Sequence, residues 1–223
     1  MYKKIVIAAF YLFLFVSPLD SFAKEPQNLA IIKKQLIRYH DSGEYQKDQA
    51  HVINQAMEYL KTRLESEKKS PTKKKLAIVL DIDETSLSNY PNMLVMDFGG
   101  TIQDINDAEG KGNDPVISST LELYRYAKAN DVAIFFVTGR TERYRAATEK
   151  NLEEVGYKNW NNLTLKPEDY REKTAAIYKT KIREQIERDG YDIVLNIGDQ
   201  KSDLAGRHAD KTFKLPNPYY IVP

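Results

Sequence analysis

The sequence contains no cysteine, and this absence excludes several kinds of chemistry. Without thiols the chain can form no disulfide, no zinc–thiolate site, no iron–sulfur cluster, no cysteine nucleophile and no lipid anchor on cysteine. The three histidines, His40, His51 and His208, stand in no catalytic motif, and we expect them to be surface or structural residues. A formal net charge of +1 argues against nucleic-acid binding through a broad basic field.

The remaining composition is that of an ordinary globular protein. Hydrophobic residues make up 42% of the 223 residues and charged residues 29%, which argues against a disordered or fibrous chain. This length suits one domain, or one domain with a small cap, and it is ample for a buried core.

Residues 1–23 have the layout of a secretory signal peptide. A short basic start precedes an unbroken apolar run, 5–16, and Ser21-Phe22-Ala23 places small residues before a predicted cleavage site. The run is shorter than the roughly 20 residues that cross a bilayer comfortably. We therefore expect cleavage after Ala23 and a periplasmic or secreted protein with no stable membrane anchor. A buried helix or an uncleaved anchor is the alternative.

The mature chain is predicted to have an α/β fold. Helical spacing over 27–40 and 45–68 indicates an N-terminal helical segment, 24–70, which a polar linker separates from a core domain, 71–223. In that domain apolar runs typical of buried parallel strands alternate with helical patterns. The strands are predicted at 76–80, 132–137, 162–165, 193–197 and 211–215, and the helices at 116–129, 141–154 and 172–189.

This alternation predicts a doubly wound, Rossmann-like parallel sheet with helices on both faces. The insertion 88–114 follows the first strand, and its stretch 98–114, rich in Gly, Asn and Asp, is expected to be irregular. We expect the insertion and the segment 24–70 to form a small, mainly helical cap. Tyr90 and Phe98 are candidates either for stacking on a substrate base or for simple packing.

Chemically selective residues follow three of the predicted strands, where parallel sheets bind ligands. They are Asp81 and Asp83 after the first strand, Thr138 and Gly139 after the second, and Asp199 and Asp203 after the apolar run 193–197. Carboxylates placed this close together repel each other unless a cation lies between them or one of them is protonated, and oxygen ligands suit Mg²⁺. Each group alone is explained by a capped turn, but together they form the set that metal-assisted phosphoryl transfer needs.

A lysine near residue 179 could neutralise a phosphoryl group as a point charge. Lys173, Lys179 and Lys181 compete for this position.

With these motifs the sequence resembles the haloacid dehalogenase superfamily of phosphohydrolases. Within it, the chain is similar to the secreted acid phosphatases that include bacterial nonspecific enzymes and plant vegetative storage proteins. The stretches that carry the resemblance are LDIDETSLSN (80–89), FVTGR (136–140), TAAIYKTKIR (174–183) and NIGDQKSDL (196–204).

The resemblance implies a role for each motif residue. Asp81 would be the nucleophile that forms an aspartyl-phosphate, and Asp83 the general acid and then the base. Thr138, Gly139 and Lys179 would bind the phosphoryl group. Mg²⁺ would be held by Asp81, by the backbone carbonyl of Asp83 and by Asp199. Asp203 would either bind the ion directly or support the residues that do.

The sequence thus predicts an exported, Mg²⁺-dependent acid phosphatase that hydrolyses small phosphomonoesters, with nucleoside monophosphates as one candidate class. A non-catalytic storage or binding protein on the same fold is the alternative, against which the intact pair Asp81 and Asp83 argues. A phospho-accepting receiver module uses similar residues, but the export signal disfavours it. We expect no nucleic-acid polymer as partner, and a homo-oligomer stays open.

Overall fold

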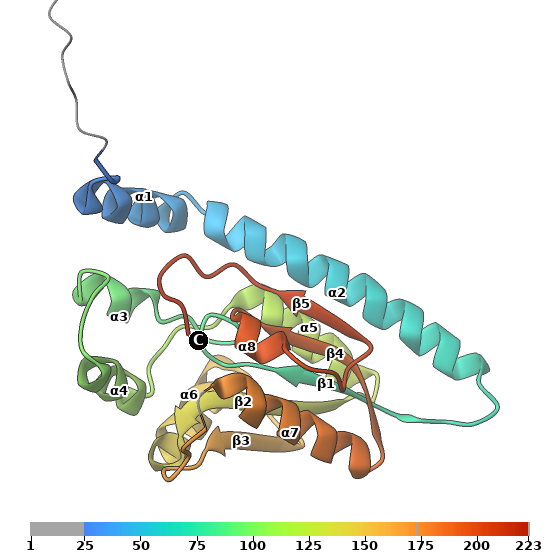
Figure 1. Ribbon diagram of the computed structural model, residues 1–223. Coiled ribbons are helices and arrows are strands. Elements are labelled where there is room, and N and C mark those ends of the chain that lie inside the picture. The colour runs from blue at the N-terminus through green and yellow to red at the C-terminus, as the bar shows by residue number, and fades with distance from the viewer. Residues whose placement is uncertain (1–24, 173, 223) are drawn as a thin grey trace, which may run out of the picture.

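A five-stranded parallel sheet forms the centre of the protein (Figure 1). The computed structural model describes residues 25–172 and 174–222, so the predicted signal peptide, 1–23, and Lys173 lie outside the described residues. The strand order is β3-β2-β1-β4-β5. The strands are β1 Lys75–Leu80, β2 Ala133–Thr141, β3 Asn162–Lys166, β4 Tyr191–Gly198 and β5 Lys211–Lys214. The predicted doubly wound α/β fold is confirmed.

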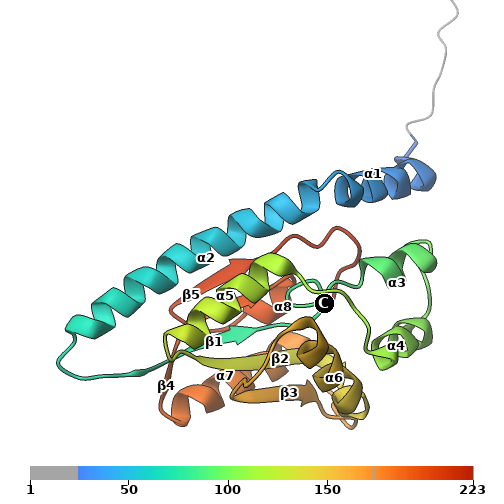
Figure 2. The same cartoon turned by 180° about the vertical axis from the view of Figure 1, so that it is seen from behind.

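Helices cover both faces of the sheet, as Figures 1 and 2 show from opposite sides. They are α1 Leu29–Asp41, α2 Glu44–Lys69, α3 Tyr90–Val95, α4 Ile102–Lys111, α5 Ser118–Ala129, α6 Arg145–Val155, α7 Ala175–Arg188 and α8 Lys201–Leu204. A 3₁₀ turn, Glu142–Tyr144, precedes α6, because β2 continues through Thr141. The predicted helix 141–154 therefore begins later than expected.

The central strand β1 shows why its sequence is apolar without interruption. Ile78 and Leu80 belong to the core beneath α2 and α5, whereas Ala77 and Val79 belong to a second core beneath α7. Successive side chains of a strand point to opposite faces, so a strand that is covered on both faces needs an apolar residue at every position. This double burial fixes the register of β1 and the direction of the residues that follow it.

The insertion after β1 is helical, and the expectation that 98–114 is irregular was wrong. Helix α4 begins with a capping box, in which Thr101 and Asp104 exchange side-chain and backbone hydrogen bonds. It ends at Gly112, whose φ of 59° lies in the left-handed region that favours glycine. Gly and Asp in this stretch are thus helix-terminal signals, although their abundance suggests a loop.

The N-terminal helical segment divides in two. Helix α2 lies along the sheet, where Ile53 and Leu60 join the main core. Helix α1 has no buried residue and reaches the insertion instead. There the ring of His40 stacks on Tyr90, with 3.3 Å between the ring centroids. Thus α1 lies beside the helices of the insertion, while most of α2 is part of the sheet's helical layer (Figure 2). No helix in the described part of the chain is both long and apolar enough to cross a membrane.

Candidate active site

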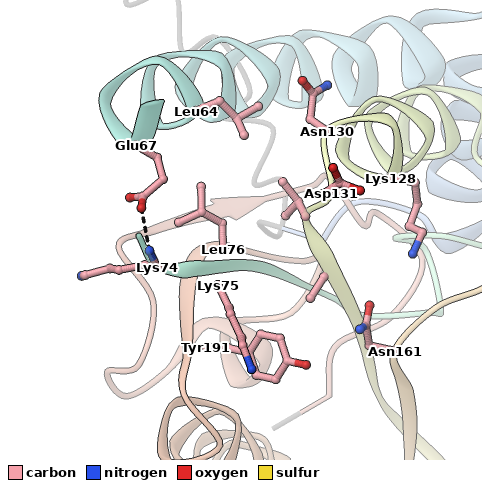
Figure 3. A pocket seen from close by; sticks show the side chains of 12 residues that line it. Leu64, Glu67, Lys74, Lys75, Leu76, Lys128, Asn130, Asp131, Asn161 and Tyr191 are labelled. Atoms are coloured by element: carbon pink, nitrogen blue, oxygen red, sulfur yellow. Dashed lines mark hydrogen bonds between the residues drawn. The ribbon is translucent and has the colours of Figure 1, made fainter. Parts of the chain in front are cut away.

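Cavities lie at both ends of the sheet. The cavity at the amino ends of the strands has about 470 Å³ and is lined by lysines and asparagines (Figure 3). One of these, Lys74, is ion-paired with Asp192 at 3.1 Å. The cavity at the carboxyl ends has about 370 Å³, and six of the seven predicted site residues line it: Asp81, Asp83, Gly139, Lys179, Asp199 and Asp203. The rule that ligands bind at the carboxyl ends points to the second cavity.

A buried lysine lies between two of the predicted carboxylates. Lys179 Nζ donates to Asp81 Oδ1 at 2.5 Å and to Asp203 Oδ1 at 2.7 Å. Burial raises the pKa of Asp81, and the nearby positive charge of Lys179 only partly offsets this. For Lys179 burial acts in the lowering direction, but the charges of Asp81 and Asp203 outweigh it and raise its pKa. Lys179 is therefore a fixed positive charge at this point of the cavity.

The alternative lysine, Lys181, lies elsewhere. Its side chain is exposed and pairs with Glu172 on the surface. Helix α7 explains the difference, because residues two apart point to different sides of a helix. Of the two competing lysines that the structure describes, only Lys179 lines the cavity.

Asp81, Asp199 and Asp203 together offer a cation site. One carboxylate oxygen from each lies within 4.8 Å of the others, and all three residues are buried. Burial, together with the charge of Asp203, raises the pKa of Asp199 to about 7. Three carboxylates against one ammonium leave an excess of negative charge, and an oxygen-only donor set suits a hard divalent cation. The residues present therefore fit a divalent metal ion.

Asp83 forms an ion pair that the sequence did not indicate. Arg140 Nη2 donates to Asp83 Oδ1 and to Asp114 Oδ2, each at 2.7 Å, and the arginine is almost fully buried. Burial acts to raise the pKa of Asp83, but the Arg140 charge and hydrogen bonds, with that from Asn89, outweigh it and lower the pKa. Arg140 was visible in the FVTGR stretch. Its partner Asp114 was not, because no local pattern marks a pairing between distant segments.

Thr138 occupies a different position from the other predicted residues. It is fully buried, and its Oγ accepts a hydrogen bond from the backbone N–H of Arg140 at 3.1 Å. Gly139, next to it, lines the cavity, and a Cβ at this position would meet no atom within 4 Å. The backbone at this end of β2 therefore borders open space where an anion can approach it.

The C-terminal segment 216–222 forms a strap across the carboxylate loops. Asn217 donates to Asp199 at 2.7 Å, and the Tyr220 hydroxyl donates to Glu84. Glu84 is fully buried with a left-handed φ of 52°, and burial together with the charge of Asp83 raises its pKa to about 8. Sequence reasoning missed these contacts, and only the adjacency of polar and aromatic residues at 217–220 marks the strap. The strap reaches the cavity itself, which Tyr220, Ile221 and Val222 line.

The wall opposite these carboxylates comes from the insertion and the end of the strap. It is largely apolar, and Glu109 of α4 is its acidic residue. Its main members are Met93, Met96, Ile105, Ala108, Glu109, Ile221 and Val222. We call this surface the cap wall. The opposite, carboxylate side, which is built from the loops after β1 and β4, the end of β2 and helix α7, we call the core wall. Of the two alternatives for Tyr90 and Phe98, the structure shows packing, since Tyr90 lies on His40 and Phe98 on Tyr219.

Comparison with known proteins identifies the family and agrees with the fold. The sequence model of one family, described as HAD superfamily, subfamily IIIB (acid phosphatase), matches residues 17–223. The chain is 38% identical over 188 residues to the stem 28 kDa glycoprotein of Glycine max, covering 81% of this chain and 71% of that protein. It is 37% identical over 150 residues to acid phosphatase 1 of Solanum lycopersicum, covering 65% of this chain and 58% of that enzyme's length.

Solved structures agree with the sequence comparison. A class C acid phosphatase from Bacillus anthracis with tungstate bound has a TM-score of 0.69 and 26% identity, with 86% of each chain covered.

Proposed function

The chain belongs to the acid phosphatases of HAD subfamily IIIB, and we propose that it is an exported, Mg²⁺-dependent phosphomonoesterase that works through an aspartyl-phosphate. The observation that carries this proposal is the buried arrangement of Asp81, Lys179 and Asp203, with Asp199 beside it. A carboxylate that is held against a fixed ammonium and next to a cation site can approach an anionic phosphate, which bare repulsion would otherwise prevent.

Asp81, Asp199 and Asp203 would hold the metal ion through carboxylate oxygens, and the backbone carbonyl of Asp83 is a further candidate ligand. When bound, Mg²⁺ supplies positive charge that stabilises the phosphoryl oxygens as charge develops on them. Hard oxygen donors favour Mg²⁺ over the softer transition metals.

In the first proposed step, an Asp81 carboxylate oxygen attacks phosphorus while the bond between phosphorus and the ester oxygen breaks. The leaving oxygen takes a proton from Asp83, and the alcohol departs. Lys179 and the backbone beside Gly139 bind the phosphoryl oxygens. Because Arg140 favours the ionised form of Asp83, an acidic medium favours the protonated form that this step needs.

In the second proposed step, water attacks the phosphorus of the aspartyl-phosphate. Asp83, now ionised, takes a proton from that water, and the bond between phosphorus and the Asp81 oxygen breaks. Inorganic phosphate leaves, Asp81 is again a carboxylate, and Asp83 again carries its proton. The cycle balances without any redox partner.

Removal of the metal ion tests the metal dependence. Phosphate release from aryl, sugar and nucleoside phosphates should stop in a chelator and return when Mg²⁺ is added in excess. Full activity in the chelator would contradict the metal's part in the proposal. Release from none of these esters, with Mg²⁺ present, would instead favour the storage or binding alternative.

Export is the part of the proposal that depends on residues 1–23 alone. A short basic start, an apolar run and small residues before Lys24 support cleavage after Ala23. The mass of the protein recovered from cells decides the matter. A mature chain that begins at Lys24, found outside the cytoplasm, agrees with the proposal, and an uncleaved chain in the cytoplasm contradicts it.

A further inference from the structure

The cap wall of the active-site cavity contains a carboxylate that has no protein partner. Glu109, on α4, lines the cavity and is half-buried. Within residues 25–172 and 174–222 its carboxylate makes no hydrogen bond or ion pair, and only burial and more distant charges act on it. A buried or half-buried carboxylate is normally paired, so an unpaired one at the edge of a substrate cavity needs an explanation.

The packing of α4 directs Glu109 toward the cavity. On one side of the helix, a Cβ at Gly110 would lie 3.3 Å from the ring of Tyr144, so α4 approaches the segment before α6 closely there. Ile105, Ala108 and Glu109 have the spacing i, i+3 and i+4, which places them on one face of the helix. All three line the cavity. The direction of Glu109 therefore follows from the helix itself.

The charges around Glu109 leave this carboxylate short of a cation. Arg140 is already bonded to both Asp83 and Asp114. Burial, together with the charges of Asp83 and Asp114, raises the pKa of Glu109 to about 8, because the positive charges of Arg140 and Lys166 offset these effects only in part. A positively charged group that entered the cavity beside Glu109 would neutralise this carboxylate.

We propose that Glu109 selects phosphomonoesters whose leaving group carries an ammonium group. The proposal rests on the proposed phosphatase function and names the substrate class of the same site. Asp83 is the proposed proton donor to the leaving oxygen. Glu109 lines the same cavity, and the charge of Asp83 acts on it, so we place Glu109 on the leaving-group side. The neighbouring Met93, Met96 and Ile105 are apolar, and the positive charge of Lys166, which also lines the cavity, offsets the effects on Glu109 only in part. An ammonium on a short carbon chain fits this combination.

Two esters that differ in a single group test the proposal. 2-Aminoethyl phosphate ends in an ammonium, and n-propyl phosphate has a methyl group in the same place. Glu109 is largely protonated in the free protein at pH 7, and an ammonium beside it favours the ionised carboxylate, which then accepts a charge-assisted hydrogen bond. With Mg²⁺ at pH 7, we expect the wild-type protein to favour 2-aminoethyl phosphate by about tenfold in kcat/KM, the scale of one such hydrogen bond. p-Nitrophenyl phosphate serves as a reference ester for catalytic competence.

Variants of the cap helix assign the preference to one side chain. Glu109→Gln should bring the ratio of the two kcat/KM values close to one, with little change for p-nitrophenyl phosphate, and Glu109→Lys should reverse the preference. Asp107→Asn is the matched control, since Asp107 is exposed on the same helix and, within the described residues, bonds only to Gln103. It should keep the wild-type ratio. Circular dichroism checks that each variant is folded.

The outcomes separate the two proposals. If none of the three esters is hydrolysed with Mg²⁺, the proposed function fails and the inference about Glu109 fails with it. If all three are hydrolysed but wild type shows no preference for the amine, or Glu109→Gln and Glu109→Lys keep the preference, the inference alone is overturned. A preference that disappears in Glu109→Gln but not in Asp107→Asn supports it.

Discussion

The two walls of the active-site cavity differ in how their polar groups are satisfied. On the core wall, the central charged groups are buried and paired, as in the bonds of Lys179 to Asp81 and Asp203. On the cap wall, apolar side chains such as Met93 and Met96 predominate, and Glu109 has no protein partner in the described chain. The core wall follows strands of the sheet, whereas the cap wall is built by an insertion and by the end of the chain.

This difference between the walls corresponds to a division between catalysis and substrate preference. A paired, buried network is rigid because the loss of any member leaves an unsatisfied charge, which is costly. An apolar wall with one unsatisfied charge can change its leaving-group preference by single substitutions that leave the network intact. We therefore expect core-wall variants to lose turnover for every ester and cap-wall variants to change the order of preference among esters.

Lys179→Ala should have the largest of the effects that distinguish the walls. Loss of the ammonium removes the charge that faces Asp81, and phosphate release should fall by about a thousandfold for all esters alike. Lys181→Ala is the matched control, because that side chain is exposed on the same helix. Steady-state kinetics on an aryl and an alkyl phosphate measure both. A loss confined to one ester would contradict the assignment of Lys179 to the core wall.

Asn217→Ala should have an intermediate effect, because the strap supports the core wall from outside. Asp199 would lose one of its hydrogen bonds, and the Mg²⁺ concentration for half-maximal activity should rise by about tenfold. The maximal rate at saturating Mg²⁺ should change much less. Asn54→Ala, at an exposed position on α2, is the control. An unchanged Mg²⁺ requirement would show that the strap does not position Asp199.

The smallest effect concerns stability and pH at the cap wall. The pKa of Glu109 is raised by burial from 4.5 to about 8, so between these pH values the folded protein holds a proton here that the unfolded chain releases. This contribution is fully present below pH 4.5 and is lost as pH rises through 8. After allowance for partial exposure, wild type should lose about 1 kcal/mol more than Glu109→Gln over this range.

Urea unfolding of both proteins at pH 5 and pH 8, in chelator, measures this difference. An identical pH dependence in wild type and Glu109→Gln would show that the carboxylate is not desolvated, and the contrast between the walls would weaken.

The sequence predicts the core wall far better than the cap wall, for a physical reason. Strand burial on both faces produces an apolar run whose end marks the site, so Asp81 and Asp199 could be found from local pattern alone. Arg140 was visible in a motif, but its pairing with Asp83 depends on the sheet bringing β1 and β2 side by side. The cap helix α4 was predicted as irregular, because Gly and Asp mark its ends as well as loops.

The strap could not be predicted at all. Asn217 contacts Asp199 across strand β5, and Tyr220 contacts Glu84, which lies more than a hundred residues earlier in the chain. No periodic sequence pattern indicates contacts of this kind. Glu109 is a related case. Helical periodicity explains the face of α4 on which it lies. Its lack of a partner depends on which other side chains line the cavity and on the bonds of Arg140 to Asp83 and Asp114.

The covalent step on Asp81 is the central claim, and a rapid-quench experiment tests it most directly. Wild-type protein mixed with excess phosphomonoester and Mg²⁺ is stopped in acid within one turnover, digested and analysed by mass spectrometry. We predict one phosphoryl group on the peptide that contains Asp81, and neither this adduct nor turnover in a folded Asp81→Asn variant. Phosphate on another residue, or full turnover by Asp81→Asn, would contradict the account.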